Sequence, residues 1–441
     1  MDSSALVAGK PAEQPDLRSQ QIYFGLCGLF LVGLFFSRAL ITTVPILLFV
    51  FALTRPGLKE RFQLLKQNRS ALGLLAIYVF LLVSVIYTDN LPNYTRQIYR
   101  YAAILFFPLA GGLLPPLNRK QVYALLFFFV LLTTVITIGT MVQYLSNIDT
   151  QNQLIIHSQN PPTINRIFHI HFGVMMTLAI FFGVHIFQDR QIIWRKAEKY
   201  IALSCVILIL VSIHVLAYRT GLLALYVTLI FKIFNFIKNQ KRYLLGGSLL
   251  ALLLIVPVFA YYSLESVQLR VQNTRTDISR YLQHQDINYY SISQRLAAWE
   301  TAFTVIKRNW VVGVGPADIS REMKQQYAIH DFGLIKENQV MIHNQYLHML
   351  MGMGIIGLLL FLGVLISPFW RRLSQNDFCI TAFLVSTCTA MMVDSFFELQ
   401  RGLNLIVFFY FLLIILKEQR MLISKIPLKS EKMQAAVLKQ G

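Results

Sequence analysis

The sequence predicts an all-α polytopic membrane protein, and this prediction depends on composition, recurring apolar runs and the placement of basic residues. Hydrophobic residues make up 56% of the 441 residues and charged residues only 14%, which is not the composition of a soluble domain. The apolar runs are long enough to cross roughly 30 Å of hydrocarbon. Each run must be helical, because lipid offers no hydrogen-bond partner to a backbone amide.

About twelve transmembrane helices are expected from these runs. Their predicted positions are residues 21–36, 39–54, 71–87, 98–114, 121–143, 167–187, 200–217, 220–237, 243–263, 344–369, 378–397 and 403–417. Five regions follow from them: a tail (1–20), a membrane domain of nine helices (21–263), a large loop (264–343), three more membrane helices (344–417) and a basic tail (418–441). The loop is predicted to be partly helical, around residues 293–308.

Basic residues indicate the orientation, because short cytoplasmic loops carry an excess of Lys and Arg. The basic residues of the predicted inner connections are Arg55, Lys59, Arg61, Lys66, Arg69, Arg119, Lys120, Arg190, Arg195, Lys196, Lys199, Lys238, Lys241, Arg242, Arg371 and Arg372. Both tails are therefore expected in the cytoplasm and the large loop on the outer side. The first apolar run leads straight into a second, so the N-terminus is expected to remain uncleaved.

The formal net charge of +19 mostly reflects this inner-side bias. The expected partners of these charges are anionic membrane lipids and not nucleic acid. Four cysteines, Cys27, Cys205, Cys379 and Cys388, fall inside predicted spans without close spacing. We interpret them as small apolar packing residues.

Arg219 is the first candidate functional residue, in a tight turn between two apolar runs. A cation deep in hydrocarbon costs up to about 2.5–3.5 kcal/mol, so it requires an anionic partner or an aqueous cavity. The alternative is that Arg219 only reaches the lipid phosphates at the membrane surface.

Arg295 and Trp299 lie one helical turn apart in the loop, on the same face as Ala302. The segment Gly313-Val314-Gly315 follows them, and its glycines allow a sharp turn back toward the membrane. The alternative is a solvated arginine on a surface helix followed by ordinary turn glycines. The Gly-x-Gly pattern lacks the third glycine of a nucleotide-binding fingerprint.

His343 is the third candidate, directly before the tenth predicted span. A neutral imidazole can accept a proton from a sugar hydroxyl, as a general base must. The alternative is a structural histidine that forms hydrogen bonds at the membrane surface.

Metal catalysis is not expected, because the loop has only separated acids and no Asp-x-Asp pair for a divalent ion. His169 and His171 have i, i+2 spacing on a helix, which makes a zinc pair implausible. A bound diphosphate would therefore be neutralised by arginines, whose planar guanidinium groups match phosphate oxygens. Direct displacement at the sugar carbon would invert its configuration, since no carboxylate nucleophile is evident.

At these residues the chain resembles the O-antigen ligase family, which shares a domain with O-antigen polymerases and bacterial O-oligosaccharyltransferases. The resemblance covers the many helices, the large late loop, the arginine–tryptophan helix followed by Gly-Val-Gly, and two further motifs. These motifs are His343-Asn344-Gln345-Tyr346-Leu347 and Gly352-Met353-Gly354-Ile355-Ile356-Gly357.

The resemblance implies a glycosyltransferase C-like fold and an active site at the outer, periplasmic face of the bacterial inner membrane. It implies a glycan donor linked to undecaprenyl diphosphate, an acceptor that is the lipid A-core oligosaccharide, and no cofactor. Arg219 and Arg295 match the arginines that engage the diphosphate in this family. His343 matches its proposed base. Secondary candidates are Asn344, Tyr346, Trp299, Arg96, Arg100, Asp394, Glu398 and Arg401. The charged residues among them could equally form a structural ion-pair set that pins helix ends.

Two rival functions remain open from the sequence. A polymerase or O-oligosaccharyltransferase of the same family would use a different acceptor, and motifs barely separate it from a ligase. A transporter of a lipid-linked glycan is suggested by the number of helices alone. Transporters tend to carry inverted repeats and broken, charged helices near the midplane, whereas the polar residues here lie at helix ends and in one loop.

Overall fold

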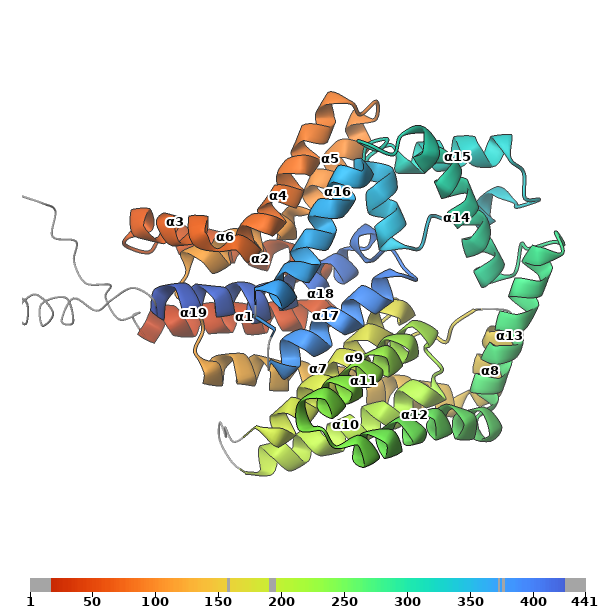
Figure 1. Cartoon of the computed structure of the whole chain (residues 1–441), viewed down its shortest axis with the longest axis horizontal. Helices are drawn as coiled ribbons and strands as arrows, with labels where there is room; N and C mark the ends of the chain where they lie inside the picture. The colour runs from red at the N-terminus through yellow and green to blue at the C-terminus, as the bar shows by residue number, and fades with distance from the viewer. Residues whose placement is uncertain (1–16, 157–158, 190–195, 372, 375–376, 425–441) are drawn as a thin grey trace, which may run out of the picture.

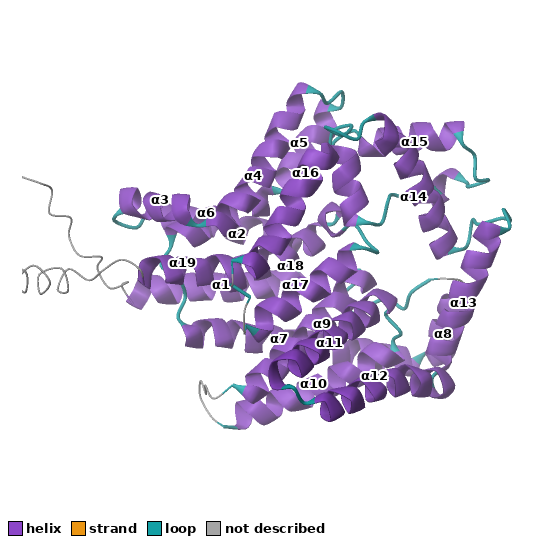
Figure 2. Ribbon diagram, viewed as in Figure 1, coloured by secondary structure: helices purple, strands orange, loops and turns teal. Residues whose placement is uncertain are grey.

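The computed structural model describes residues 17–424, except 157–158, 190–195, 372 and 375–376. Every element in this part of the chain is a helix (Figure 2). Most of the two predicted tails lies outside the described residues. So do Arg190, Arg195 and Arg372, three of the basic residues assigned to inner connections.

The helices follow one another with short connections along the chain. The first part forms α1 (Leu17–Phe36), α2 (Arg38–Leu53), α3 (Leu58–Gln67), α4 (Arg69–Val83), η1 (Ser84–Ile86), α5 (Leu91–Arg100), α6 (Ala102–Leu113), α7 (Arg119–Ser146), α8 (Ile148–Ile156), α9 (His169–Gln188) and α10 (Ala197–Val215). The second part forms α11 (Arg219–Gln240), α12 (Tyr243–Ser263), α13 (Glu265–Leu282), α14 (Ser291–Arg308), α15 (Ile319–Ile329), η2 (Lys336–Asn338), α16 (Gln345–Trp370), α17 (Phe378–Met391), η3 (Phe396–Glu398), α18 (Gln400–Tyr410), η4 (Phe411–Ile415) and α19 (Leu416–Ser424).

By length and composition, eight helices of the described chain can cross a membrane: α1, α4 together with η1, α7, α9, α10, α11, α12 and α16. The helices α2 and α17 are apolar but shorter. The predicted span at 98–114 is divided between α5 and α6, and the one at 403–417 extends over α18, η4 and α19. The multi-pass helical architecture is therefore confirmed, whereas the count of twelve spans stays a prediction.

The interior of the bundle is built around α9, which packs against α7, α10, α11 and α17. Most of the side chains of α9 are buried against these neighbouring helices, so little of α9 is exposed on the surface of the bundle. The opposite case is α12, where Gly246 and Ala260 are the only buried residues. An apolar helix that is exposed on nearly all sides is the expected state of a helix surrounded by lipid.

The predicted loop 264–343 contains α13, α14, α15 and η2, and it has a small hydrophobic core of its own. Ala298, Ala302 and Met323 are in this core, which extends onto Met351 of α16. Figure 1 places α13, α14 and α15 at one end of the bundle, opposite the end where α1 begins and α19 stops. The helix predicted around 293–308 is confirmed as α14. The sidedness of the loop stays a prediction.

Candidate active site

His343 and Asp394 form the central pair of the site. Nδ1 of His343 lies 2.7 Å from Oδ1 of Asp394, and the two side chains are 28% and 4% exposed. A carboxylate only accepts hydrogen bonds, so Nδ1 donates and the neutral ring keeps its lone pair on Nε2. Burial acts to raise the pKa of Asp394, but the hydrogen bond from His343 and the electrostatic influence of the nearby His343, His171 and Arg295 side chains outweigh it and leave this pKa below its usual value. Asp394 is therefore ionised at neutral pH.

Two segments distant in sequence hold this pair together. The backbone N–H of Asn344 donates to Oγ of Ser395 at 3.1 Å. The backbone N–H of Phe397 donates to Oε1 of Gln345 at 2.8 Å. Asn344 also caps α16, because its side-chain oxygen accepts from the second and third residues that follow it. The start of α16 is thereby fixed beside the segment that carries Asp394.

Tyr346, another secondary candidate, contacts the same neighbouring region. Its hydroxyl donates to the carbonyl of Cys388 at 2.9 Å, which ties the first turn of α16 to the end of α17. Asn344 and Tyr346 thus fix the backbone next to His343.

Helix α14 donates hydrogen bonds to the backbone of the residues that directly precede Asp394 and His343. Nη1 of Arg295 donates to the carbonyl of Val393 at 3.1 Å, directly before Asp394. One turn later, Nε1 of Trp299 donates to the carbonyl of Ile342 at 2.7 Å, directly before His343. Burial lowers the pKa of Arg295, and the charge of Asp394 opposes that shift. The predicted common face of α14 is therefore the face that meets the site.

The glycine turn after α14 pairs with a break in α16. Gly354 has φ 64° and ψ −169°, a backbone conformation essentially reserved for glycine. The backbone N–H of Val314 donates to the carbonyl of Met351 at 2.8 Å, and that of Ile355 donates to the carbonyl of Trp310 at 2.8 Å. A Cβ on Gly313 would lie 2.5 Å from the carbonyl carbon of Gly352, so only glycine permits this contact.

Arg219 begins α11 after a tight turn in which Ala217 has φ +48°. Its Nη1 donates to Oγ1 of Thr274 on α13 at 3.3 Å. The start of α11 is held against α9 by a close backbone approach, because a Cβ on Gly221 would lie 2.7 Å from the carbonyl oxygen of Gly173. Arg295 is close enough to Arg219 for their positive charges to repel one another.

Arg270, Thr274 and Asp277 lie on one face of α13, and the sequence reasoning did not select them. Oδ2 of Asp277 accepts from the backbone N–H of Ile292 at 2.9 Å, which fixes the start of α14. Burial raises the pKa of Asp277, while that hydrogen bond and the charge of Arg219 oppose the shift. The i, i+4, i+7 spacing of three polar residues was the available sequence signal.

His171 was another residue without an assigned role. It is buried in α9, and its Nε2 lies 3.9 Å from Oδ2 of Asp394, on the carboxylate oxygen that His343 does not contact. Neither of these two atoms has a hydrogen-bond partner among the described residues. Asp394 therefore lies between two histidines, one on α9 and one at the start of α16.

A second ion-pair cluster includes two of the secondary candidates. The carboxylate of Glu398 lies 3.0 Å from Nη1 of Arg100 and 3.0 Å from Nε2 of His348. Burial acts to raise the pKa of Glu398, but the charges and hydrogen bonds of His348 and Arg100 outweigh it and lower this pKa. This cluster joins the end of α5 and η3 to the first turn of α16.

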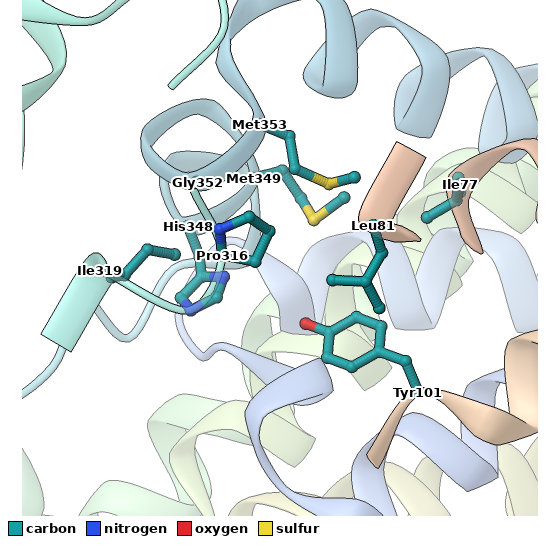
Figure 3. Close-up of a pocket in the computed structure, with 9 residues that line it drawn as sticks. All are labelled: Ile77, Leu81, Tyr101, Pro316, Ile319, His348, Met349, Gly352 and Met353. Carbon is teal, nitrogen blue, oxygen red and sulfur yellow. The ribbon is translucent and has the colours of Figure 1, made fainter. Parts of the chain in front are cut away.

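His348 also lines a cavity of about 10 Å³ together with Tyr101 and with Pro316, the residue after the glycine turn (Figure 3). A volume of this size holds about one water and no substrate. The last two secondary candidates form no hydrogen bond or ion pair with His343. Arg96 is exposed on α5, and Arg401 contacts the backbone carbonyls of Arg166 and Phe35 at 3.5 Å.

Together, these features define a multi-pass helical membrane protein with an arginine-rich histidine–aspartate site at one end of its bundle. A family model described as O-antigen ligase matches residues 203–362. The match supports the resemblance found in the motifs over this part of the chain. The matched region includes Arg219, Arg270, Arg295 and His343, whereas Asp394 lies beyond it. A search of curated proteins gives no match.

Proposed function

We propose that this protein is an O-antigen ligase: it transfers a glycan from undecaprenyl diphosphate to the lipid A-core oligosaccharide at the periplasmic face of the bacterial inner membrane. The single observation that carries the proposal is the contact of 2.7 Å between His343 and the buried Asp394, with Arg295 beside the pair. The family match supports an enzyme acting on lipid-linked glycans. The proposed sidedness depends on the distribution of basic residues.

In the proposed reaction, Nε2 of His343 accepts the proton of an acceptor sugar hydroxyl. The hydroxyl oxygen forms a bond to the anomeric carbon of the donor glycan. The bond between that carbon and the diphosphate oxygen breaks, and the electron pair leaves with the diphosphate. Because attack and departure occur on opposite faces of the carbon, the configuration inverts.

Asp394 has a supporting role in this mechanism. Its carboxylate holds the Nδ1–H tautomer of His343 and stabilises the imidazolium that forms when the ring accepts the proton. Arg219 and Arg295 supply the positive charge that the departing diphosphate needs, with bidentate guanidinium geometry. These groups provide a complete proton and charge balance without a metal or cofactor.

The test is an assay with the purified protein and a glycan linked to undecaprenyl diphosphate. One arm contains the lipid A-core acceptor, and the other contains a second lipid-linked repeat unit. Product on lipid A-core supports the ligase, whereas product only on the second unit would identify a polymerase. Movement of the glycan across reconstituted vesicles without a new glycosidic bond would identify a transporter.

Single substitutions of the three residues test the mechanism itself. Changing His343 to Ala is expected to lower transfer by about 10²–10⁴-fold, and changing Arg219 or Arg295 to Ala by about 10²–10³-fold. Membrane insertion should be unchanged in each variant. Full complementation of a ligase-null strain by all three variants would rule out the proposal.

A further inference from the structure

A second, larger cavity lies beside the end of α16, whereas His343 lies directly before the start of that helix. Its volume is about 600 Å³, and small-molecule sites typically have about 300–1,000 Å³. The lining comes from the end of α3, the start of α4, the residues that follow α16, and α19. Figure 1 shows α3 and α19 at the end of the bundle opposite α14 and α15. No step of the proposed reaction uses this cavity.

The cavity lies where two membrane-spanning helices reach the membrane surface. Helix α4 begins at Arg69 and α16 ends at Trp370, and both are long and apolar enough to cross a membrane. Trp370 is exposed, as is common for tryptophans at the interface between lipid and water. Leu72 lines the cavity and is exposed on the same face of α4 as Val79, two turns further into the span. The cavity therefore adjoins the face of α4 that is exposed to lipid.

The acid in the lining of this cavity is already bound by other groups. Glu418 of α19 accepts the backbone N–H groups of Arg69 and Ser70 at 3.1 and 3.0 Å, which fixes the start of α4. Nη1 of Arg371 pairs with the same carboxylate at 2.5 Å. Nη2 of Arg371 donates to Oγ of Ser70 at 2.6 Å. Glu418 and Arg371 thus join α19, α4 and the end of α16 to one another.

Two cations of the lining remain available to a ligand. Lys66 and Arg69 are exposed, and the side chain of neither forms an ion pair with any described residue. The flanking segments do not reverse the positive sign. The other charged residues described on α3, on α19 and between α16 and α17 are the bases Lys59, Arg61, Lys417 and Arg420 and the acids Glu60 and Asp377. Asp377 is itself paired with Lys417 at 2.8 Å.

The charge of the cavity indicates which occupant fits it. Residues 425–441, which follow α19 in the chain, contain four lysines and one acid, so this segment has the same sign of charge as the cavity. An anionic phospholipid has the complementary charge, and its acyl chains suit the lipid-facing side that Leu72 and Met421 supply. A zwitterionic phospholipid carries a cation that offsets its own phosphate, so it is attracted less.

We propose that this cavity is a binding site for an anionic phospholipid, whose phosphate contacts Lys66 and Arg69 and whose acyl chains lie along the exposed face of α4. The bound lipid adds a link between α3 and α4 beside the contact of Glu418 with Arg371. Lys66, Arg69 and Arg371 belong to predicted inner connections, so the lipid would come from the inner leaflet. The inference does not depend on the proposed function.

Lipid binding to the full-length, delipidated protein in detergent tests the proposal. Native mass spectrometry measures the affinity for the first bound molecule of dioleoylphosphatidylglycerol, and dioleoylphosphatidylcholine is the zwitterionic comparison. The wild type should bind the phosphatidylglycerol more tightly. Replacing Lys66 and Arg69 together by Gln should weaken this binding about thirtyfold, with about fivefold for each single substitution. Exchanging the two cations, Lys66→Arg with Arg69→Lys, should largely retain it.

Two further variants separate the cavity from general surface charge. Lys238→Gln with Arg242→Gln removes one exposed lysine and one exposed arginine from another predicted inner connection, and it should bind phosphatidylglycerol like the wild type. Met421→Trp narrows the cavity without changing its charge and should lower the affinity. Because the side chains of Lys66, Arg69, Lys238 and Arg242 are all exposed, both double variants should unfold at the wild-type temperature when no lipid is added.

Four results would each overturn the inference. Equal loss of binding in the two double-glutamine variants would show attraction by the whole basic surface. Equal affinity of the wild type for both phospholipids would show that the anionic charge is not recognised. Wild-type affinity in Met421→Trp would place the lipid outside the cavity. Displacement of the phosphatidylglycerol by an equal concentration of inorganic phosphate would identify a site for free phosphate. Glycan transfer is not a readout in any of these measurements, so their failure leaves the proposed function unaffected.

Discussion

Nε1 of Trp299 donates a hydrogen bond to the carbonyl oxygen of Ile342 at 2.7 Å. This contact fixes the residue before His343, while Arg295 on the previous turn of α14 fixes the residue before Asp394. A single helix of the loop thereby sets the separation of the two groups that form the central pair. The geometry of the candidate base depends on the packing of α14 as much as on its own side chain.

Replacing Trp299 by Phe should loosen this arrangement while keeping most of the ring packing. The loss of one partly buried hydrogen bond is expected to cost about 1 kcal/mol of unfolding free energy. Transfer should fall with it, because the loop before His343 is no longer held. Thermal unfolding in detergent and initial transfer rates are the measurements. Trp310→Phe is the control, since Trp310 is an exposed side chain; equal effects of both substitutions would contradict the role of Trp299.

Replacing Asp394 by Asn should disable the His343 pair without changing its size. The amide carries no charge to stabilise an imidazolium, so the turnover rate is expected to fall about 10²-fold or more. The Michaelis constant for the donor should change little, because the phosphate-binding arginines are untouched. Glu337→Gln, an exposed acid of the same loop, should transfer at the wild-type rate. Wild-type turnover in Asp394→Asn would exclude His343 and Asp394 as a working pair.

The same carboxylate gives a prediction for acid stability. The folded-state pKa of Asp394 lies below its usual value, so its ionised form stabilises the folded state at pH values above the unfolded pKa of about 3.9. That contribution is lost as the pH falls through the folded pKa. The difference in unfolding temperature between wild type and Asp394→Asn should be constant from pH 7 to about pH 5 and shrink below about pH 4. A difference that is independent of pH down to pH 3 would contradict this.

Gly354→Ala should disrupt the contact between the glycine turn and α16. An added Cβ would lie 2.1 Å from the carbonyl oxygen of Val311, and the backbone conformation alone costs about 1–3 kcal/mol for a residue with a side chain. We expect a lower unfolding temperature and faster proteolysis of the loop. Gly363→Ala is the matched control on the same helix, because nothing lies within 4 Å of its added Cβ. It should be neutral or stabilising by up to about 1 kcal/mol.

The sequence alone identified those site residues that stand out from their immediate neighbours in the chain. Arg219 and His343 are polar groups at the borders of apolar runs. Placing a charge or an imidazole near hydrocarbon costs free energy unless a polar partner or an aqueous cavity offsets it. Arg295 and Trp299 were found because a helix places residues four apart on one face. The glycine turn was found because its backbone conformation depends on residue type and not on distant contacts.

The sequence identified only some of the site residues that come from distant segments of the chain. Asp394 was only one of several secondary candidates, because its distance from His343 is set by the packing of α17 against the start of α16. Arg270 was missed, since a loop arginine looks solvated until tertiary structure buries it. Glu398 proved to belong to a different cluster, with Arg100 and His348.

By itself, the sequence determined that the protein is helical, that it crosses the membrane many times and that a polar loop follows α12. These properties follow from the free-energy cost of exposing backbone groups and charges to hydrocarbon. That cost applies to each segment separately, whatever its tertiary contacts. Only the tertiary structure decided which carboxylate orients His343, which arginines share its region and how α14 holds the pair. Those relationships join residues tens to hundreds of positions apart, and packing, not local periodicity, sets their distances.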